Sequence, residues 1–200
     1  FEYTDATPNT LILDAPYIYT NGTNIFNAAR DYKGWITVKQ ALAESRNIPA
    51  LKVFQSVDKQ KIANYVHSFG IDYGQNLYES ASIGAFDGVT ALEMSAAYGA
   101  YARGGYYIEP YSYTQITYRD NGEIYVKATK KTKVCSKKTA KYINDILVSA
   151  ASEYHNLGTL EIGSTQAAAK TGTTTIDSKI IKALDLNESA IMDSWACIYT

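Results

Sequence analysis

Two short polar motifs, far apart in the chain, constrain its fold more than any other feature. One is Lys170-Thr171-Gly172-Thr173, which follows a run of alanines, and the other is Ser45-Arg46-Asn47, which falls between two helix-like segments. The alanines and the motif after them predict a narrow strand over residues 166–173. If the two motifs form one site, the fold has to place this strand against the bend that carries Ser45 and Asn47. We expect the two to face a shared crevice.

Composition excludes several classes of protein. The 200 residues carry 19 Lys and Arg against 20 Asp and Glu, so no overall positive field exists to attract nucleic acid or anionic lipid. Cys135 and Cys197 are too few for a disulfide framework, and neither has a further Cys or His at metal-ligand spacing. We therefore predict no metal site, no cofactor and no nucleic-acid partner. No segment resembles a signal peptide or reaches the ~18 apolar residues of a membrane span.

A pair of helices is predicted around the first motif. Thr37 followed by Gln40 has the pattern of a capping box, and the apolar residues after Thr37 recur with Ser45 at helical spacing. Ser45 is therefore predicted as the last inward-facing residue of a helix. The proline at position 49 disfavours helical geometry at Ile48 and suits the first turn of a second helix, which ends near position 57. Ser45 and Asn47 are thus expected on a stiff connector between two helices.

The remaining elements follow from caps, turns and periodicity. Residues 1–34 are rich in Asn, Asp and Pro and are predicted to be irregular. Asn121-Gly122 predicts the turn of a peripheral β-hairpin at about 106–128. Further predictions are helices from Asp58 to before Gly70, from Thr90 to about Gly104 and from Ser136 to about Ser152, and a second strand at 194–200. Residues 174–193 are predicted to form a long, partly helical connection between the two strands.

The residue types of the second motif suit the binding of an extended peptide. A peptide that adds to a strand edge needs free backbone groups and a small residue where two chains approach closely, and Gly172 meets that need. Lys170 places a cation beside it, and the hydroxyls of Thr171 and Thr173 are suited to holding a substrate carboxylate. The alternative is a strand-to-turn transition with a solvated lysine. Alone, the motif does not decide between the two.

The Ser45-Arg46-Asn47 connector has an equivalent pair of interpretations. Ser45 and Asn47 are suited to act as a proton relay and a clamp on a substrate amide, whereas the alternative is a helix end at which Asn takes left-handed geometry. The order and spacing of the motifs favour the first, because S-x-N and K-T-G are two of three signatures of enzymes that handle penicillin and D-Ala-D-Ala peptides. The third, S-x-x-K, is matched by Ser56 and Lys59, but at a predicted helix junction, and we do not assign the nucleophile there.

Four blocks of the sequence resemble the transpeptidase domain of class A penicillin-binding proteins, the bifunctional peptidoglycan synthases. The blocks are residues 35–50, 89–110, 169–173 and 193–200, and they come in the family's order. The resemblance implies an α+β fold, an α/β sandwich of the penicillin-binding and β-lactamase type with a helical subdomain against an antiparallel sheet. It also implies that residues 1–200 are part of a DD-transpeptidase domain, extracytoplasmic and attached to the membrane through a parent protein.

By resemblance, such a domain cross-links peptidoglycan stem peptides that end in D-Ala-D-Ala, and β-lactam antibiotics acylate it. In the family, the serine of S-x-x-K attacks the peptide carbonyl and passes the acyl group to an amine. Ser45 then relays a proton, Asn47 holds the substrate amide and Lys170 organises Ser45 electrostatically. Thr171 and Thr173 bind the terminal carboxylate, and the Thr173 amide forms half of the oxyanion hole.

The sequence departs from the family pattern at both ends. The resemblance places the nucleophile helix before Phe1 and further sheet elements after Thr200. We therefore expect an incomplete domain that forms no acyl-enzyme alone, its nucleophile and remaining strands coming from the rest of a parent protein or from a second chain. The alternatives are a serine β-lactamase or DD-carboxypeptidase of the same fold, and a non-catalytic module that binds stem peptide or senses β-lactams. The block at 93–110 favours the synthase.

Overall fold

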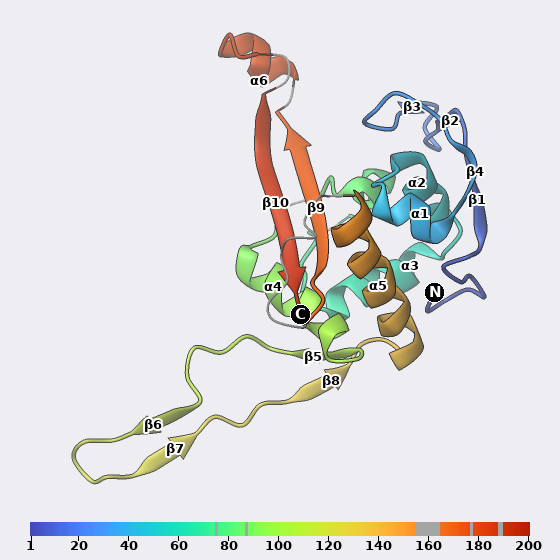
Figure 1. Cartoon of the computed structure of the whole chain (residues 1–200). Helices are drawn as coiled ribbons and strands as arrows, with labels where there is room; N and C mark the ends of the chain where they lie inside the picture. The colour runs from blue at the N-terminus through green and yellow to red at the C-terminus, as the bar shows by residue number, and fades with distance from the viewer. Residues whose placement is uncertain (75, 87, 155–164, 177, 188–189) are drawn as a thin grey trace.

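The computed structural model describes residues 1–74, 76–86, 88–154, 165–176, 178–187 and 190–200. Helices pack beside a long strand pair, with α6 at the tip of that pair, and this mixture of helices and antiparallel strands confirms the predicted α+β class (Figure 1). The helices are α1 (Val38–Ala43), α2 (Asn47–Gln55), α3 (Lys59–Ser68), the 3-10 helix η1 (Glu79–Ile83), α4 (Ala91–Ala102), α5 (Lys137–Ser149), the π-helix η2 (Ala150–Tyr154) and α6 (Ser178–Ala183). The strands are β1 (Leu11–Asp14), β2 (Tyr17–Ile18), β3 (Asn24–Ile25), β4 (Gly34–Thr37), β5 (Tyr106–Ile108), β6 (Gln115–Thr117), β7 (Ile124–Val126), β8 (Lys131–Lys133), β9 (Ala168–Thr175) and β10 (Ile191–Tyr199).

The two longest strands, β9 and β10, form an antiparallel ribbon beside the helices (Figure 1). Their register is regular from Ala168 opposite Tyr199 to Thr173 opposite Ser194, and it shifts near Ile191. Both strands extend beyond the predicted bounds, to Thr175 and back to Ile191. Between them, the described part of the predicted connection at 174–193 contains α6. Helix α5 packs against β9 and α4 against β10, so the helices cover one face of the ribbon.

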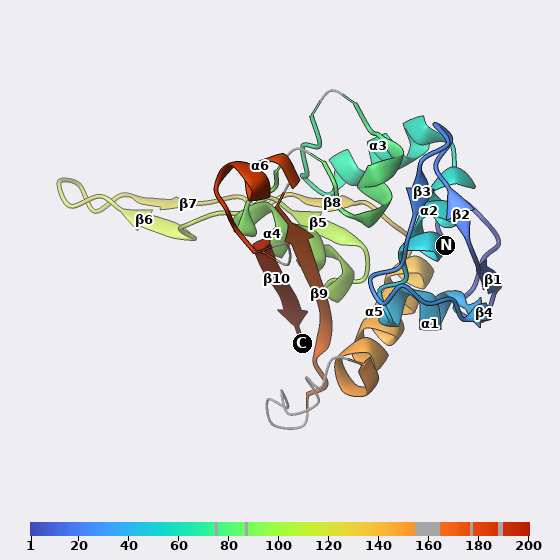
Figure 2. The same cartoon turned by 90° about the horizontal axis from the view of Figure 1, so that it is seen from above.

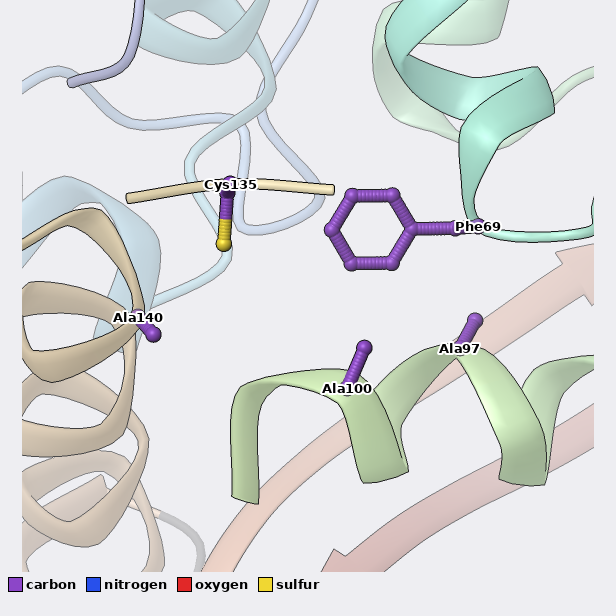
Figure 3. Close-up of a cluster of buried hydrophobic side chains, with 5 residues drawn as sticks. All are labelled: Phe69, Ala97, Ala100, Cys135 and Ala140. Carbon is purple, nitrogen blue, oxygen red and sulfur yellow. The ribbon is translucent and has the colours of Figure 1, made fainter. Parts of the chain in front are cut away.

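A buried cluster joins three of the helices (Figure 3). Phe69, which ends α3, points its ring across Ala97 and Ala100 of α4 toward Cys135, and Ala140 of α5 lies on the far side of Cys135. The small alanine side chains let the helices approach closely enough for one phenyl ring and one thiol to fill the space between them. Because α4 also contacts β10, this cluster supports the face of the ribbon that the helices cover.

A long two-stranded arm projects from the body of the molecule in both views (Figures 1 and 2). Its base is the pair β5–β8 and its tip is the pair β6–β7. The Asn121-Gly122 turn is confirmed between β6 and β7, with Gly122 at a φ of 70°. All six residues of β6 and β7 are exposed. The pairing in the arm continues to Lys133, beyond position 128.

The N-terminal segment is more ordered than predicted. Residues 1–34 were predicted to be irregular, but within them β2 pairs with β3, and β1 pairs with β4, which begins at Gly34. Ile25 of β3 is buried against Ile48 and Leu51 of α2. Strands of two to four residues are too short to show the alternation on which strand prediction depends. Tertiary packing, rather than local periodicity, therefore orders this segment.

The predicted helix caps are largely confirmed. The side chains of Thr37, Asp58 and Ser136 each accept a hydrogen bond from the backbone amide three residues later, and Thr90 with Glu93 forms a complete capping box. At α1 only half of the predicted box forms. The Gln40 side chain donates to Glu44 instead of bonding back to the cap residue.

Gly104 and Gly105, which follow α4, provide a matched test of what fixes the base of the arm. Both have positive φ, of 65° and 96°, but a Cβ on Gly105 would collide with the Cys135 carbonyl oxygen, whereas a Cβ on Gly104 has open space. We expect Gly104→Ala to cost about 1 kcal/mol of unfolding free energy for its left-handed conformation. Gly105→Ala should cost roughly 3 kcal/mol because strain and overpacking add. Urea unfolding measures both, and equal losses would contradict the packing argument.

Candidate active site

The bend after α1 has the hydrogen bonds of a Schellman motif. The Arg46 amide donates to the Ala41 carbonyl at 2.9 Å and the Ser45 amide donates to the Leu42 carbonyl at 3.2 Å. Ser45 takes the left-handed position, with a φ of 55°, which glycine usually occupies. The prediction that Ser45 is the last inward-facing helical residue is therefore wrong. The helix ends at Ala43, and Ser45 lies exposed on the bend.

Helix α2 begins earlier than predicted, at Asn47. Ile48 was expected to be excluded from the helix by the following Pro49, but it lies within α2 and is completely buried. Its amide donates to Asn27 Oδ1 at 3.2 Å. Burial and this hydrogen bond outweigh the usual preference of a residue before proline for extended geometry. Asn47 therefore opens a helix two residues after Ser45, and the left-handed residue of this bend is Ser45, not the asparagine.

Strand β9 brings Lys170 to this bend. The Lys170 ammonium donates to the Ser45 hydroxyl oxygen and, at 2.8 Å, to the Thr171 carbonyl oxygen. Lys170 and Ser45 are 125 positions apart in the sequence, so only the tertiary fold brings them together. Helix α5 contacts both α1 and β9 and sets their separation. The two motifs paired in the sequence analysis thus meet in the structure.

The surroundings of Lys170 destabilise its charge. Burial lowers the pKa of the Lys170 ammonium, and the nearby Cys197 thiol opposes that shift in part. Cys197 lies opposite Lys170 in the strand register. Burial raises the pKa of the Cys197 thiol, while a hydrogen bond with Tyr98 and the charge of Lys170 partly oppose the shift. A lysine with a lowered pKa exchanges a proton with a hydroxyl more readily at neutral pH than an ordinary lysine does.

The other residues of the two motifs are placed as follows. The side-chain nitrogen of Asn47, Nδ2, donates to the Phe26 backbone carbonyl at 2.9 Å. Thr171 is half-buried, whereas Gly172 and Thr173 are exposed on β9. A Cβ on Gly172 would meet only Trp195 Cβ, at an ordinary contact distance of 3.9 Å. Packing within the described part of the chain therefore does not require glycine at this position.

Sequence reasoning missed the part played by Arg46, the middle residue of the first motif. Its side chain is 6% exposed and forms ion pairs with Asp14, which is fully buried, and with Asp31. Burial alone would lower the pKa of Arg46, but hydrogen bonds with Asp31 and Asp14 outweigh that effect and raise it. The Arg46 hydrogen bond is also the largest cause that lowers the pKa of Asp31. The only signal in the sequence was an arginine placed between the two polar residues Ser45 and Asn47.

Other candidate sites are less well supported. The Ser56 hydroxyl donates to the Val53 carbonyl, and Lys59 begins α3, so this S-x-x-K match lies at a helix junction. A pocket of about 380 Å³ lies beside α2 and η1, but its Glu79 carboxylate already accepts hydrogen bonds from Thr20 and Gln55.

The described residues contain no cluster of three or more metal-ligating side chains. Within the same residues, every helix is too short or too polar to cross a bilayer.

Comparison with known proteins identifies the class. The family described as the penicillin binding protein transpeptidase domain matches residues 5–191. Penicillin-binding protein 1A/1B of Bacillus subtilis (strain 168) is 36% identical over 192 residues, which are 94% of this chain and 21% of that protein. Penicillin-binding protein 1A of Streptococcus pneumoniae is 34% identical over 57% of this chain and 17% of its own length. This chain therefore spans about a fifth of the length of these curated relatives.

Solved structures show the same fold. The penicillin-binding protein PonA1 from Mycobacterium tuberculosis superposes with a TM-score of 0.81 at 20% identity, covering 98% of this chain and 53% of that one. Penicillin-Binding Protein 1A from Haemophilus influenzae gives a TM-score of 0.73 at 23% identity, over 84% of this chain and 32% of that one. The chain belongs to the penicillin-binding protein transpeptidase domain family, and the curated relatives reported above are penicillin-binding proteins 1A/1B and 1A.

Proposed function

We propose that this chain provides the S-x-N and K-T-G parts of a DD-transpeptidase site that cross-links peptidoglycan stem peptides through a serine acyl-enzyme. The observation that carries the proposal is the contact between Lys170 and the Ser45 hydroxyl. Relatives with acyl-enzyme structures support it, since penicillin-binding protein A from Mycobacterium tuberculosis has been solved as an imipenem acyl-enzyme complex with a TM-score of 0.73 to this chain. We also propose that the activity lies outside the cytoplasm, where the stem peptides are, and that the chain is associated with the membrane through a parent protein.

The first chemical role is proton transfer. When a serine attacks an amide or a β-lactam, its proton has to reach the leaving nitrogen. Ser45 is exposed and touches Lys170, whose pKa burial lowers. We assign to Ser45 the relay of that proton and to Lys170 the electrostatic control of the Ser45 hydroxyl. Asn47, two residues along, holds the substrate amide.

The second role is substrate alignment by β9. Among the described strands, β9 pairs with β10 alone, and we infer that an extended peptide lies along its other edge. Gly172 is exposed on this strand, and its neighbours within the chain leave room for a Cβ. We infer that the space is needed by substrate backbone. Thr171 and Thr173 then bind the terminal carboxylate, and the Thr173 amide contributes to the oxyanion hole.

The test is covalent labelling of the natural gene product that contains this chain with a fluorescent penicillin. We expect one labelled serine, other than Ser45, when the adduct is mapped by mass spectrometry. Ser45→Ala should slow its formation by about a hundredfold, a typical contribution of general acid–base transfer. Absence of an adduct would overturn the proposed function, and an adduct on Ser45 itself would overturn the relay role. A long-lived acyl-enzyme, rather than rapid hydrolysis, separates a transpeptidase from a β-lactamase of this fold.

A further inference from the structure

The Ser45 bend does not have the conformation that its own residues prefer. A left-handed serine is disfavoured relative to glycine, because its Cβ crowds the following carbonyl oxygen, and Ser45 has a φ of 55°. Residues of this kind persist where the surrounding structure imposes the conformation, and they concentrate at functional sites. Helix α1 has only six residues and is too short to impose it alone. The restraint has to come from elsewhere in the fold.

Four side chains beside the bend supply this restraint, and we name them the arginine clamp: Arg46, Asp14, Asp31 and Asn27. Arg46 Nε and Nη2 lie 2.9 and 2.6 Å from Asp14 Oδ2, and Nη1 lies 2.7 Å from Asp31 Oδ1. Nη2 also donates to the Asp31 backbone carbonyl at 2.8 Å. A planar guanidinium bound through three nitrogens has no freedom to rotate. The side chain therefore fixes the residue that lies between Ser45 and Asn47.

Asn27 extends the clamp to the next turn of the chain. Its side-chain nitrogen, Nδ2, donates to Asp14 Oδ1 at 2.8 Å and to the Asp31 backbone carbonyl at 2.9 Å. Its side-chain oxygen, Oδ1, accepts a hydrogen bond from the Ile48 backbone amide at 3.2 Å. Asn47 donates to the Phe26 carbonyl at 2.9 Å. Three successive residues after Ser45 are thus each bonded to the N-terminal segment. That segment holds the bend on one side while Lys170 contacts Ser45.

From this geometry we propose that Arg46 is a positioning residue of the active site: the arginine clamp holds Ser45 in the left-handed conformation that presents its hydroxyl to Lys170 and sets Asn47 at the start of α2. The inference rests on the proposed function. Arg46 acts through Ser45 and Asn47, not on the substrate. Releasing the clamp therefore lowers the rate of the acylation step more than the affinity for the β-lactam, because small errors in the position of a proton relay affect the transition state most.

The test compares Asp31→Ala with Asp145→Ala in the natural gene product. Both side chains are about equally exposed, at 49% and 55%, and each carboxylate lies 2.7 Å from its cation, but only Asp31 belongs to the clamp. Acylation by a fluorescent penicillin is followed over a range of concentrations, at a temperature where circular dichroism shows folded protein. We expect Asp31→Ala to lower the limiting rate about tenfold with little change in half-saturating concentration. Asp145→Ala should leave both unchanged.

Arg46→Lys provides a second readout, because lysine keeps the charge but cannot bind through three nitrogens. We expect its limiting rate to fall about a hundredfold; should this variant fail to fold, Asp31→Ala decides alone. A folded Asp31→Ala that acylates at the wild-type limiting rate overturns the positioning role and leaves the proposed function intact. Equal losses in Asp31→Ala and Asp145→Ala overturn it as well. A wild-type protein that forms no adduct overturns the proposed function, and this inference with it.

Discussion

Alanine in place of Lys170 is expected to slow acylation by a labelled β-lactam about a thousandfold. The lysine makes the contact with Ser45 that joins the two motifs. A positioned proton-transfer group typically contributes about 10²–10⁴-fold, and a donor aimed at developing charge contributes about 10²–10³-fold. Removal of Lys170 affects both functions at once because Ser45 loses its partner and the site loses its cation. The rate of adduct formation in the natural gene product measures the effect.

The fold of the Lys170→Ala variant should be preserved, which separates a chemical defect from unfolding. Alanine continues the run of small residues on β9, and removing a charge that burial destabilises is not expected to lower stability. Lys130→Ala is the control, because Lys130 is an exposed lysine between β7 and β8. We expect the control to acylate at the wild-type rate. Near-normal acylation by folded Lys170→Ala would contradict the assignment of the site.

The pH dependence of stability gives an independent check on Lys170. Its pKa in the folded protein lies below the ordinary value of 10.5, chiefly because of burial. The unfolded chain therefore binds this proton more tightly, and the contribution of Lys170 to stability rises with pH until both states are deprotonated. The wild type should gain stability relative to Lys170→Ala as pH increases from the folded pKa toward 10.5. Urea unfolding of both proteins at several pH values measures the difference.

The pairing of the two motifs could be predicted because residue types with a shared chemistry carry it. Lys170 and Ser45 belong to two signatures that occur together in one class of enzymes, so their contact could be expected without knowledge of the intervening path. Capped helices were predictable for a related reason. A cap such as Thr90 with Glu93 is a local interaction, and local interactions leave a local pattern.

The parts that could not be predicted depend on contacts between distant segments. Ser45 is left-handed although its sequence favours no such conformation, and Ile48 is helical although a proline follows it. Both are set by the N-terminal segment, through Asp14 and Asn27. That segment consists of strands of two to four residues with no detectable period. A buried polar network leaves no periodic pattern, so neither the clamp nor the geometry that it imposes was visible before the fold was known.

Asp14→Ala is expected to cause the largest loss of stability, about 4 kcal/mol of unfolding free energy, because it leaves Arg46 buried without its main partner. Asp14 is completely buried, Arg46 is 6% exposed, and their closest atoms are 2.6 Å apart. Such a loss is a large fraction of the stability of a typical domain. Urea unfolding measures it. Asp145→Ala, which breaks an exposed pair, should change stability by less than about 1 kcal/mol.

A double variant separates the two consequences of losing Asp14. Asp14→Ala combined with Arg46→Met removes both charges, so no buried cation remains unpaired, and we expect more than half of the lost stability to return. The bend, however, would lack the guanidinium that fixes it. The double variant should therefore fold yet acylate slowly. If it is no more stable than Asp14→Ala, the uncompensated charge is not the cause of the loss; if it acylates at the wild-type rate, Arg46 contributes stability alone.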